Sequence, residues 1–378
     1  MRPVRAAAIL ALALVLSACS DEQPGEPPAA PQTSGRATSD SPSPAPAATT
    51  AAAAVARPRV AGVVARDLAA PWGMAFLPDG SALVSERDSE RVRLVTPAGE
   101  VREVGRVRGV DGVGEGGLLG LALSPTYEQD RTLFAYFTAG SENVIARMTY
   151  DGGRLSGQRE IFDGIPAGPI HNGGRIAFGP DGFLYVGTGE AGRTERSQDR
   201  DSLGGKILRI TADGEPAPGN PFGDSPVYSL GHRNVQGLAW DSRGRLWASE
   251  FGQNRWDELN RVKPGGNYGW PEVEGRSGDD RFIDPVRQWP TDKASPSGIA
   301  VAGDSVFMAG LRGERLWQIP IPGGKAKRPR ALLSGRYGRL RAVTVAPDGS
   351  LWVMTNNRDG RGSPRRGDDK VIRLTLPG

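Results

Sequence analysis

The sequence predicts an all-β fold, a six-bladed β-propeller preceded by a signal peptide and a disordered linker. Three observations support this prediction. A strand-turn-strand pattern recurs six times along the chain, glycine accounts for 53 of the 378 residues, and no long segment has helical periodicity. Because one such repeat cannot bury its apolar surface alone, six of them are expected to pack around a common axis.

The first 19 residues have the features of a secretory signal. Arg2 and Arg5 precede an apolar run at 6–16 that is too short to span a bilayer. The run ends in LSAC at 16–19, which resembles the lipobox of bacterial lipoproteins. This resemblance implies cleavage before Cys19, lipidation of Cys19, and an extracytoplasmic protein anchored to the cell membrane. The alternative is an ordinary secretory signal with an incidental cysteine.

Residues 20–57 are rich in Ala, Pro, Ser and Thr and contain few large apolar side chains. Such a segment cannot bury enough apolar surface to offset the entropy lost when its backbone is ordered. We therefore predict a disordered tether at 20–57 and assign the propeller to 58–378. Cys19 is the only cysteine of the chain, so no internal disulfide is expected.

The repeats share an apolar strand, a turn and a second apolar strand, at a spacing of roughly 45 to 60 residues. Four of them contain a clear turn motif, Pro-Asp-Gly in three cases and Asp-Ser-Arg-Gly in the fourth. These four are GMAFLPDGSALVSE from Gly73, RIAFGPDGFLYVGT from Arg175, GLAWDSRGRLWASE from Gly237 and AVTVAPDGSLWVMT from Ala342. Two looser copies begin at Gly120 and Gly298.

The segments that flank these repeats carry further motifs, including GEGGLLG from Gly114, HNGGR from His171, GHRNVQG from Gly231 and NYGWP from Asn267. In this order and spacing they resemble the glucose/sorbosone dehydrogenase family, over essentially the whole predicted domain. Its members include soluble glucose dehydrogenases and aldose sugar dehydrogenases that use pyrroloquinoline quinone (PQQ). The resemblance implies oxidation of an aldose to its lactone, with PQQ and Ca²⁺ as cofactors.

The reaction implied by the resemblance needs a base for the sugar hydroxyl proton and an acceptor for the hydride. Imidazole suits the first task at neutral pH, and His171 matches the family's general base. Arg233 is the second catalytic residue that the resemblance implies. The quinone would accept the hydride, and a cation near its reacting carbonyl would activate it.

The resemblance also implies two calcium sites. The first would use the backbone carbonyls of Gly252 and Gln253, which are oxygen ligands of the kind that Ca²⁺ prefers. The family has His-Gly-Pro where this chain has Phe-Gly-Gln, a difference that leaves carbonyl ligands in place. The second, structural site would use the Glu258 carboxylate and the Tyr268 carbonyl. The alternative for each is a loop without a metal.

PQQ carries several carboxylates, which planar arginine side chains bind well. Arg339 and Arg341 are two apart in a predicted strand and should therefore share one face. The residues that match the family's cofactor contacts are Glu115, His171, Arg233, Asn234, Arg312, Arg339 and Arg341. Two of these depart from the family pattern: Arg312 replaces a lysine, and Glu115 replaces a glutamine of glucose dehydrogenase.

Three residues are expected near the sugar: Glu115, Asp257 and Trp289. The second histidine, His232, is expected to be structural. The net charge of +4 is spread along the chain without a basic stripe, and no nucleic-acid-binding motif occurs. The expected partners are a small aldose, a quinone or small redox protein as electron acceptor, and a membrane reached only through the lipid, with the protein itself a monomer.

Two other functions remain open from the sequence. A calcium-dependent lactone hydrolase can also be built on a six-bladed propeller, but it would need several side-chain ligands around one metal. A non-catalytic binding propeller is the second alternative. The arginines and His171 favour the dehydrogenase over both.

Overall fold

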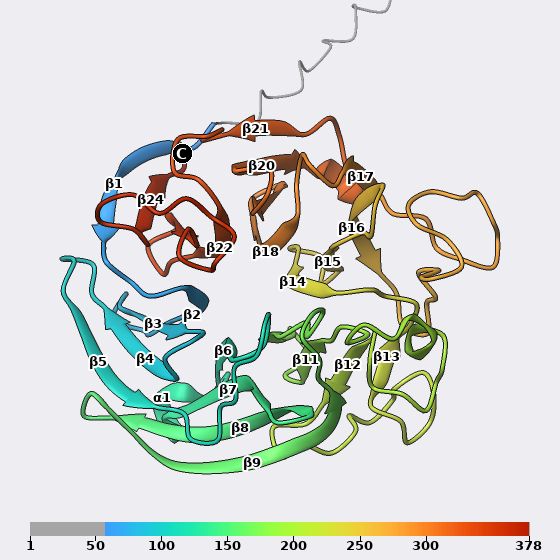
Figure 1. Ribbon diagram of the computed structural model, residues 1–378, viewed down its shortest axis with the longest axis horizontal. Coiled ribbons are helices and arrows are strands. Elements are labelled where there is room, and N and C mark those ends of the chain that lie inside the picture. The colour runs from blue at the N-terminus through green and yellow to red at the C-terminus, as the bar shows by residue number, and fades with distance from the viewer. Residues whose placement is uncertain (1–56, 378) are drawn as a thin grey trace, which may run out of the picture. The chain divides into compact units, whose positions relative to one another are not determined.

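The structure is a computed structural model that describes residues 57–377. This part of the chain forms a six-bladed β-propeller, as predicted, with the blades arranged around a central axis (Figure 1). The predicted signal peptide, Cys19 and all but the last residue of the predicted linker lie outside the described residues. Within 57–377 there is no helix with the length and apolar character needed to cross a membrane.

Each blade is a four-stranded antiparallel sheet. Blade 1 contains β2 (Pro71–Phe76), β3 (Ala82–Glu86), β4 (Arg91–Val95) and β5 (Val101–Arg106). Blade 2 contains β6 (Leu118–Leu123), β7 (Thr132–Ala139), β8 (Glu142–Asp151) and β9 (Arg154–Pro166). Blade 3 contains β10 (Arg175–Phe178), β11 (Leu184–Gly187), β12 (Ile207–Ile210) and β13 (Val227–Ser229).

Blade 4 contains β14 (Val235–Trp240), β15 (Leu246–Glu250), β16 (Trp256–Val262) and β17 (Arg287–Pro290). Blade 5 contains β18 (Pro296–Ala302), β19 (Ser305–Gly310), β20 (Arg315–Pro320) and β21 (Arg330–Leu332). Blade 6 contains β22 (Leu340–Val345), β23 (Leu351–Thr355), β24 (Val371–Thr375) and β1 (Arg59–Ala65). The described helices are short: α1 (Tyr127–Asp130), η1 (Thr194–Ser197) and η2 (Pro322–Gly324).

All six predicted repeats form the two innermost strands of a blade. Their turns explain why this sequence pattern forms a hairpin. In the Pro-Asp-Gly turn of blade 1, Gly80 has φ +83°, and the carboxylate of Asp79 accepts a hydrogen bond from the Ser81 backbone N–H at 2.8 Å. In blade 6, Asp348 accepts a hydrogen bond from Ser350 N–H at 2.9 Å. Glycine permits the left-handed backbone, and aspartate caps the turn.

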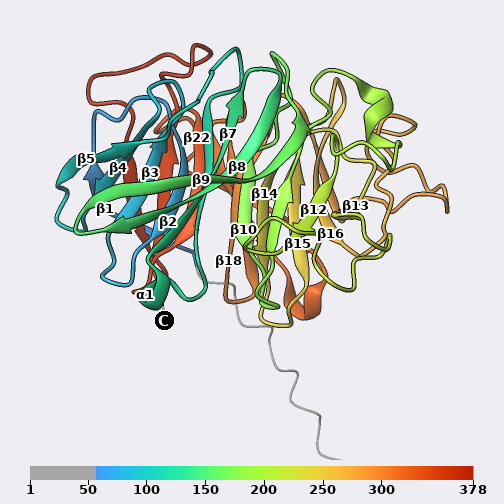
Figure 2. The same cartoon turned by 90° about the horizontal axis from the view of Figure 1, so that it is seen from below.

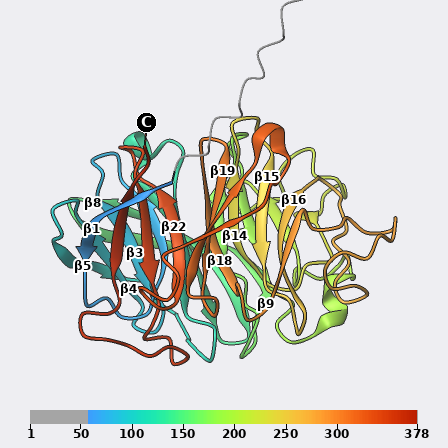
Figure 3. The ribbon, with the colours of Figure 1, turned by 90° about the horizontal axis from the view of Figure 1, so that it is seen from above.

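The ring is closed by a strand that comes from the other end of the propeller sequence. β1 pairs antiparallel with β24, so the first and last strands of the described chain share blade 6 (Figure 3). The six repeats do not predict this pairing, because β1 has no hairpin partner next to it in the sequence. The closure ties the two ends of the propeller together.

The six inner strands, β2, β6, β10, β14, β18 and β22, begin at the same end of the axis (Figure 2). The residues just before several of these strands therefore meet there, although they are far apart in the sequence. They include Glu115 before β6, His171 before β10, Arg233 before β14 and Arg339 before β22. This end of the propeller carries the candidate site.

Candidate active site

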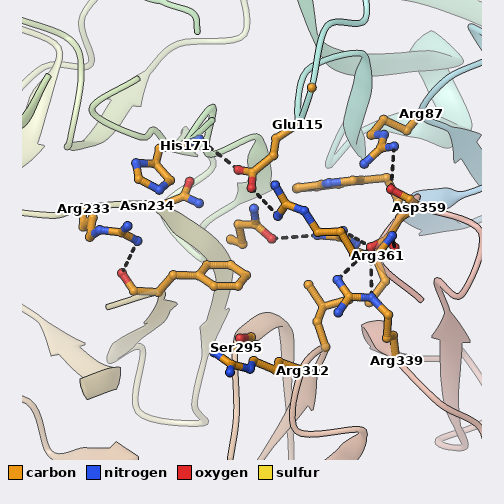
Figure 4. A pocket seen from close by; sticks show the side chains of 16 residues that line it. Arg87, Glu115, His171, Arg233, Asn234, Ser295, Arg312, Arg339, Asp359 and Arg361 are labelled. Carbon is orange, nitrogen blue, oxygen red and sulfur yellow. Dashed lines mark hydrogen bonds and ion pairs between the residues drawn. The ribbon is translucent and has the colours of Figure 1, made fainter. Parts of the chain in front are cut away.

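A cavity of about 410 Å³ lies at this end of the axis, where loops from all six blades meet. Its lining includes six arginines and two carboxylates, so its charge is strongly positive (Figure 4). The charged residues are Arg87, Glu115, Arg233, Arg312, Arg339, Arg341, Asp359 and Arg361. A cavity of this size and charge suits an anionic organic ligand.

His171 lines the cavity, and its ring is fixed from behind by a carboxylate. Its Nδ1 atom lies 2.6 Å and 3.0 Å from the two carboxylate oxygens of Glu190, which is 1% exposed. With the proton on Nδ1, that nitrogen donates to Glu190, and the Nε2 lone pair remains available to accept a proton. This is the arrangement that a general base requires.

The backbone around His171 is held in an uncommon conformation. His171 has φ +59°, and its N–H donates to Oε2 of Glu115 at 2.9 Å. The N–H of Gly173 donates to Oδ1 of Asn234 at 2.9 Å. A Cβ on Gly173 would lie 2.4 Å from the Gly187 carbonyl oxygen, so the glycine after the histidine is required by close packing. Contacts from blades 2 and 4 thus position the histidine of blade 3.

Glu115 also bridges the mouth of the cavity. Its Oε1 accepts a hydrogen bond from Nη1 of Arg361 at 2.6 Å, which joins loops 246 residues apart (Figure 4). Burial disfavours the charged form, but the hydrogen bond from His171 and the charge of Arg361 outweigh it, and the pKa of Glu115 is lowered. Glu115 is therefore an ionised carboxylate inside a cationic cavity.

Arg339 and Arg341 lie side by side, as their spacing predicted. Arg339 forms a two-pronged interaction with Oδ2 of Asp359, at 3.1 Å and 2.8 Å. Arg341 lies 3.7 Å from the same oxygen and donates to Oε1 of Gln236 at 2.8 Å. One carboxylate thus neutralises part of the charge of two arginines and sets their orientation.

Arg233 and Arg312 differ in how firmly they are held. The guanidinium of Arg233 donates to Oε1 of Gln253 at 3.1 Å and 2.9 Å and lies 5.4 Å from the ring centroid of Trp270. Arg312 is exposed, and no described side chain forms an ion pair with it within 4 Å. Its charge is therefore available to a ligand in the cavity.

The turn that contains Gly252 and Gln253 is fixed by a single carboxylate. Oε1 of Glu274 accepts hydrogen bonds from the four consecutive backbone N–H groups of 253–256, at 2.7 to 3.1 Å. Among the described residues, neither the Gly252 nor the Gln253 carbonyl accepts a hydrogen bond. Two unsatisfied carbonyls on a rigid turn fit the donor set that calcium uses.

Asp257 lies behind this turn and does not line the cavity. Its Oδ1 accepts from Gly252 N–H at 3.0 Å and its Oδ2 from Ser295 N–H at 2.6 Å. Burial raises the pKa of Asp257 to about 7. The structure therefore gives Asp257 a structural position, since it connects the turn to a cavity residue of the next blade.

A much smaller cavity, of about 10 Å³, adjoins Glu258 and Tyr268, the residues predicted for the second calcium site. Glu250 and Glu258 are both buried, and Nδ2 of Asn260 donates to each of them, at 2.8 Å and 3.0 Å. Burial and the neighbouring Glu250 raise the pKa of Glu258. Two buried carboxylates beside a small cavity suit a cation.

His232 is structural, as predicted. Its Nδ1 lies 2.8 Å from Glu250, its Nε2 lies 2.8 Å from Oγ of Ser229, and its ring stacks on Tyr268. Trp289 does not reach the cavity. It is buried in β17, where it is the cross-strand partner of Asp257, and it packs against Trp317 in an apolar core, so neither Asp257 nor Trp289 lines the cavity.

Several cavity residues were not singled out from the sequence: Trp72, Arg87, Gln236, Asp359 and Arg361, together with Glu190 behind His171. The sequence motifs could have identified two of them. Glu190 lies shortly after β11, the second strand of the hairpin that follows His171, and Gln236 belongs to the GHRNVQG motif. Of the others, Trp72 lies in the inner strand β2 and Arg87 directly follows β3, whereas Asp359 and Arg361 come from the loop between β23 and β24.

The glucose/sorbosone dehydrogenase family model matches residues 68–365. The PQQ-bound aldose sugar dehydrogenase of Streptomyces coelicolor is 59% identical, with a TM-score of 0.83 over 85% of this chain and 98% of that chain. The aldose sugar dehydrogenase YliI of Escherichia coli is 30% identical over 77% of this chain and 88% of its own length. Quinoprotein glucose dehydrogenase B of Acinetobacter calcoaceticus is 30% identical over 58% of this chain and 54% of its own length.

The chain combines a six-bladed propeller with a histidine that contacts a buried carboxylate beside an arginine-lined cavity. Together with the similarity to these enzymes, these features define an oxidoreductase. The family match covers most of the described residues and includes both the histidine and the arginines. The chain belongs to the glucose/sorbosone dehydrogenase family.

Proposed function

We propose that the protein is a PQQ- and calcium-dependent aldose sugar dehydrogenase that oxidises the anomeric carbon of a sugar to a lactone. The observation that carries the proposal is the position of His171, paired with Glu190, on the wall of the arginine-lined cavity. The 59% identity to a PQQ-bound aldose sugar dehydrogenase supports the same cofactor here.

The residues present fit PQQ. Arg233, Arg339 and Arg341 would bind its carboxylates, and Arg312 has a charge that no described carboxylate neutralises within ion-pair distance. Oδ1 of Asn234 is occupied by Gly173 N–H, so its Nδ2 is left to donate to a ligand. Calcium would be held by the Gly252 and Gln253 carbonyls, and a second ion by Glu258 and Tyr268. When bound, PQQ supplies the hydride acceptor and calcium increases its electrophilicity.

The chain's own contribution is proton transfer and orientation. Nε2 of His171 accepts the proton of the anomeric hydroxyl as the C–H bond breaks. Glu190 then stabilises the imidazolium, because its buried carboxylate lies against Nδ1. Arg233 orients the ligand beside His171, since its guanidinium is itself held by Gln253. The positive cavity favours an anionic cofactor over a neutral one.

The lactone hydrolase is less well supported by this geometry. It would need several carboxylate side chains that converge on one metal. Within residues 57–377 there is no group of three or more His, Cys, Asp or Glu side chains arranged to hold an ion. The proposal has three further parts. Electrons leave the enzyme to a quinone or a small redox protein, the protein is a monomer, and a lipid at Cys19 anchors it to the membrane.

The test is reconstitution of the purified protein with PQQ and Ca²⁺, followed by dye reduction with several aldoses. A PQQ titration monitored by absorbance measures binding separately from turnover, and omission of Ca²⁺ tests the metal. We expect binding at micromolar PQQ and sugar-dependent dye reduction. Absence of PQQ binding would exclude the proposal, and lactone hydrolysis without PQQ would favour the hydrolase. Binding without dye reduction by any aldose would favour the non-catalytic propeller.

A further inference from the structure

Loops of blades 5 and 6 beside the cavity mouth form a surface whose exposed charges are all positive. Three loops contribute, at 311–314, 333–339 and 356–370, and Figure 2 shows the last of them as the red loop at the upper left. In these loops Glu314 is half-buried and the three aspartates are buried. Their exposed charged side chains, which we call the arginine surface, are Arg312, Arg336, Arg358, Arg361, Arg365 and Arg366.

Hydrogen bonds join the three loops into one continuous surface. The N–H of Gly335 donates to the Glu314 carbonyl at 2.9 Å, which connects the first loop to the second. Nδ2 of Asn357 donates to the Tyr337 carbonyl at 2.9 Å, which connects the second loop to the third. The six arginines are therefore held near one another, although the sequence separates the first from the last by more than 50 residues.

The charge of the arginine surface is mostly not neutralised within the chain. Among the described residues, Arg361 is the one member with a carboxylate within 4 Å, that of Glu115. The nearest aspartate in these loops, Asp359, is buried and pairs with Arg339 instead. Because like charges repel one another, a partner of opposite charge would gain electrostatic energy here.

The uniform sign is specific to this side of the cavity mouth. Exposed carboxylates begin in the flanking segments, where Asp67 follows Arg66 and Asp292 pairs with Lys293. At the same end of blade 3, the exposed charged residues of the loop between β11 and β12 carry both signs. They are Arg193, Glu195, Asp199, Arg200 and Asp201.

We infer that the arginine surface docks a small acidic protein that carries one electron at a time, an inference that rests on the proposed function. Each aldose oxidised to a lactone releases two electrons and two protons. Two carrier molecules are therefore reduced in turn, and the protons pass to solvent. Arg312 and Arg361 line the cavity, so a carrier on this surface lies against the cavity mouth (Figure 4). Small, charge-steered interfaces suit a partner that must dissociate after each transfer.

An anionic membrane would also be attracted by arginines, but the geometry favours a protein. Arg59, at the start of β1, pairs with Thr375, which ends β24 away from the loop at 356–370. The predicted tether would therefore join the propeller at the end opposite to the arginine surface. A membrane held against this surface would also cover the cavity mouth, whereas a carrier that dissociates leaves it open to the sugar.

Isothermal titration calorimetry of the protein loaded with PQQ and Ca²⁺ tests the docking. The probe is a plant plastocyanin, an acidic blue-copper protein, and the comparison is mitochondrial cytochrome c, a basic carrier. We expect plastocyanin to bind at low ionic strength, with an affinity that falls as salt is added, and cytochrome c not to bind. Sugar-dependent loss of the blue absorbance should report electron transfer to plastocyanin. No plastocyanin binding, or equal binding of cytochrome c, would overturn the inference.

Charge reversal locates the docking surface. The double variant Arg365→Glu/Arg366→Glu should weaken plastocyanin binding at least about tenfold and slow plastocyanin reduction. Its dye reduction with sugar should stay at the wild-type rate, because neither residue lines the cavity, and this rate also shows that the variant is folded. The matched control Arg108→Glu/Arg193→Glu reverses two exposed arginines outside the arginine surface and should bind plastocyanin normally. Equal losses in both double variants would show an effect of net charge alone and overturn the assigned location.

Two further measurements separate this inference from its alternatives. Vesicles of phosphatidylglycerol test the lipid: vesicle binding that Arg365→Glu/Arg366→Glu abolishes, without plastocyanin binding, would make the surface a membrane site and the inference wrong. Dye reduction with PQQ and sugar but no plastocyanin docking would overturn this inference and leave the proposed function standing. Failure to bind PQQ would overturn the proposed function and, with it, the role of the partner as an electron carrier.

Discussion

The Nδ1 atom of His171 lies 2.6 Å from Oε1 of Glu190, and both side chains are buried. The contact fixes the tautomer, because a proton on Nδ1 that donates to Glu190 leaves Nε2 free to accept another. Glu190 does not line the cavity and so cannot bind the cofactor directly. In the proposed mechanism, its role is to position His171 and to stabilise the positive charge that the ring would acquire.

The first prediction is that Glu190→Gln lowers turnover without weakening PQQ binding. A neutral amide can still contact Nδ1, but it cannot stabilise an imidazolium. We expect a loss of at least about tenfold, and a larger one of about 10²- to 10⁴-fold for His171→Asn, which removes the base itself. Steady-state kinetics at saturating sugar, with a PQQ titration of each variant, measure both quantities. Wild-type turnover in His171→Asn would remove His171 from the mechanism.

The second prediction concerns Arg233, which should act chiefly on cofactor affinity. Arg233→Ala removes a charge from the cavity wall and releases Gln253, its partner at 2.9 Å. We expect PQQ affinity to fall about ten- to a hundredfold, the range for a charged hydrogen bond. Turnover at saturating PQQ should fall less. Arg233→Lys keeps the charge but not the planar geometry, so an intermediate affinity is expected. Unchanged PQQ binding in Arg233→Ala would contradict the assignment.

The third prediction is that Glu115→Gln strengthens PQQ binding but leaves the backbone at His171 unchanged. The amide oxygen of Glu115→Gln can still accept the His171 N–H, so the backbone at His171 should be retained. The variant loses only the ion pair with Arg361, whose side chain is 59% exposed, and the stability change should be about 1 kcal/mol or less. One fewer negative charge in the cavity should strengthen PQQ binding. Thermal unfolding and PQQ titration test the two effects, with Arg361→Ala as the matched control. Weaker PQQ binding by Glu115→Gln would show that the carboxylate itself is needed.

The fourth prediction is a pH dependence of stability that arises at Lys206. This side chain is 0% exposed, and its Nζ donates to three loop carbonyls, those of Arg196, Ser197 and Gly204. Burial lowers the pKa of Lys206 from 10.5 to about 7. Between these two pH values the unfolded chain binds more protons than the folded chain, so the stability contributed by Lys206 rises with pH.

The difference in free energy of unfolding between wild type and Lys206→Met should therefore be larger at pH 9 than at pH 6. Denaturant unfolding of both proteins at the two pH values measures it. Lys263→Met provides the control, because Lys263 is exposed and its removal should give a difference that does not vary with pH. A difference that stays constant for Lys206→Met, or that decreases toward pH 9, would show that Lys206 is not a buried, destabilised cation.

The sequence by itself determined the fold, because the information for each blade is local. A Pro-Asp-Gly turn between two apolar strands specifies a hairpin through backbone conformation and a capping aspartate, as at Asp79 and Gly80. Six such hairpins in one chain leave few ways to bury their apolar faces. The same locality explains why the motifs around His171 and Arg233 could be assigned to the site: each immediately precedes an inner strand.

Only the tertiary structure decided which residues from different blades meet. The contact of Glu115 with Arg361 spans 246 residues and depends on closure of the ring by β1 and β24. The same closure brings Asp359 to the cavity, whereas Trp289, expected near the sugar, lies in an outer strand within the apolar core. A side chain's distance from the axis depends on the packing of neighbouring blades, and no single repeat contains that information.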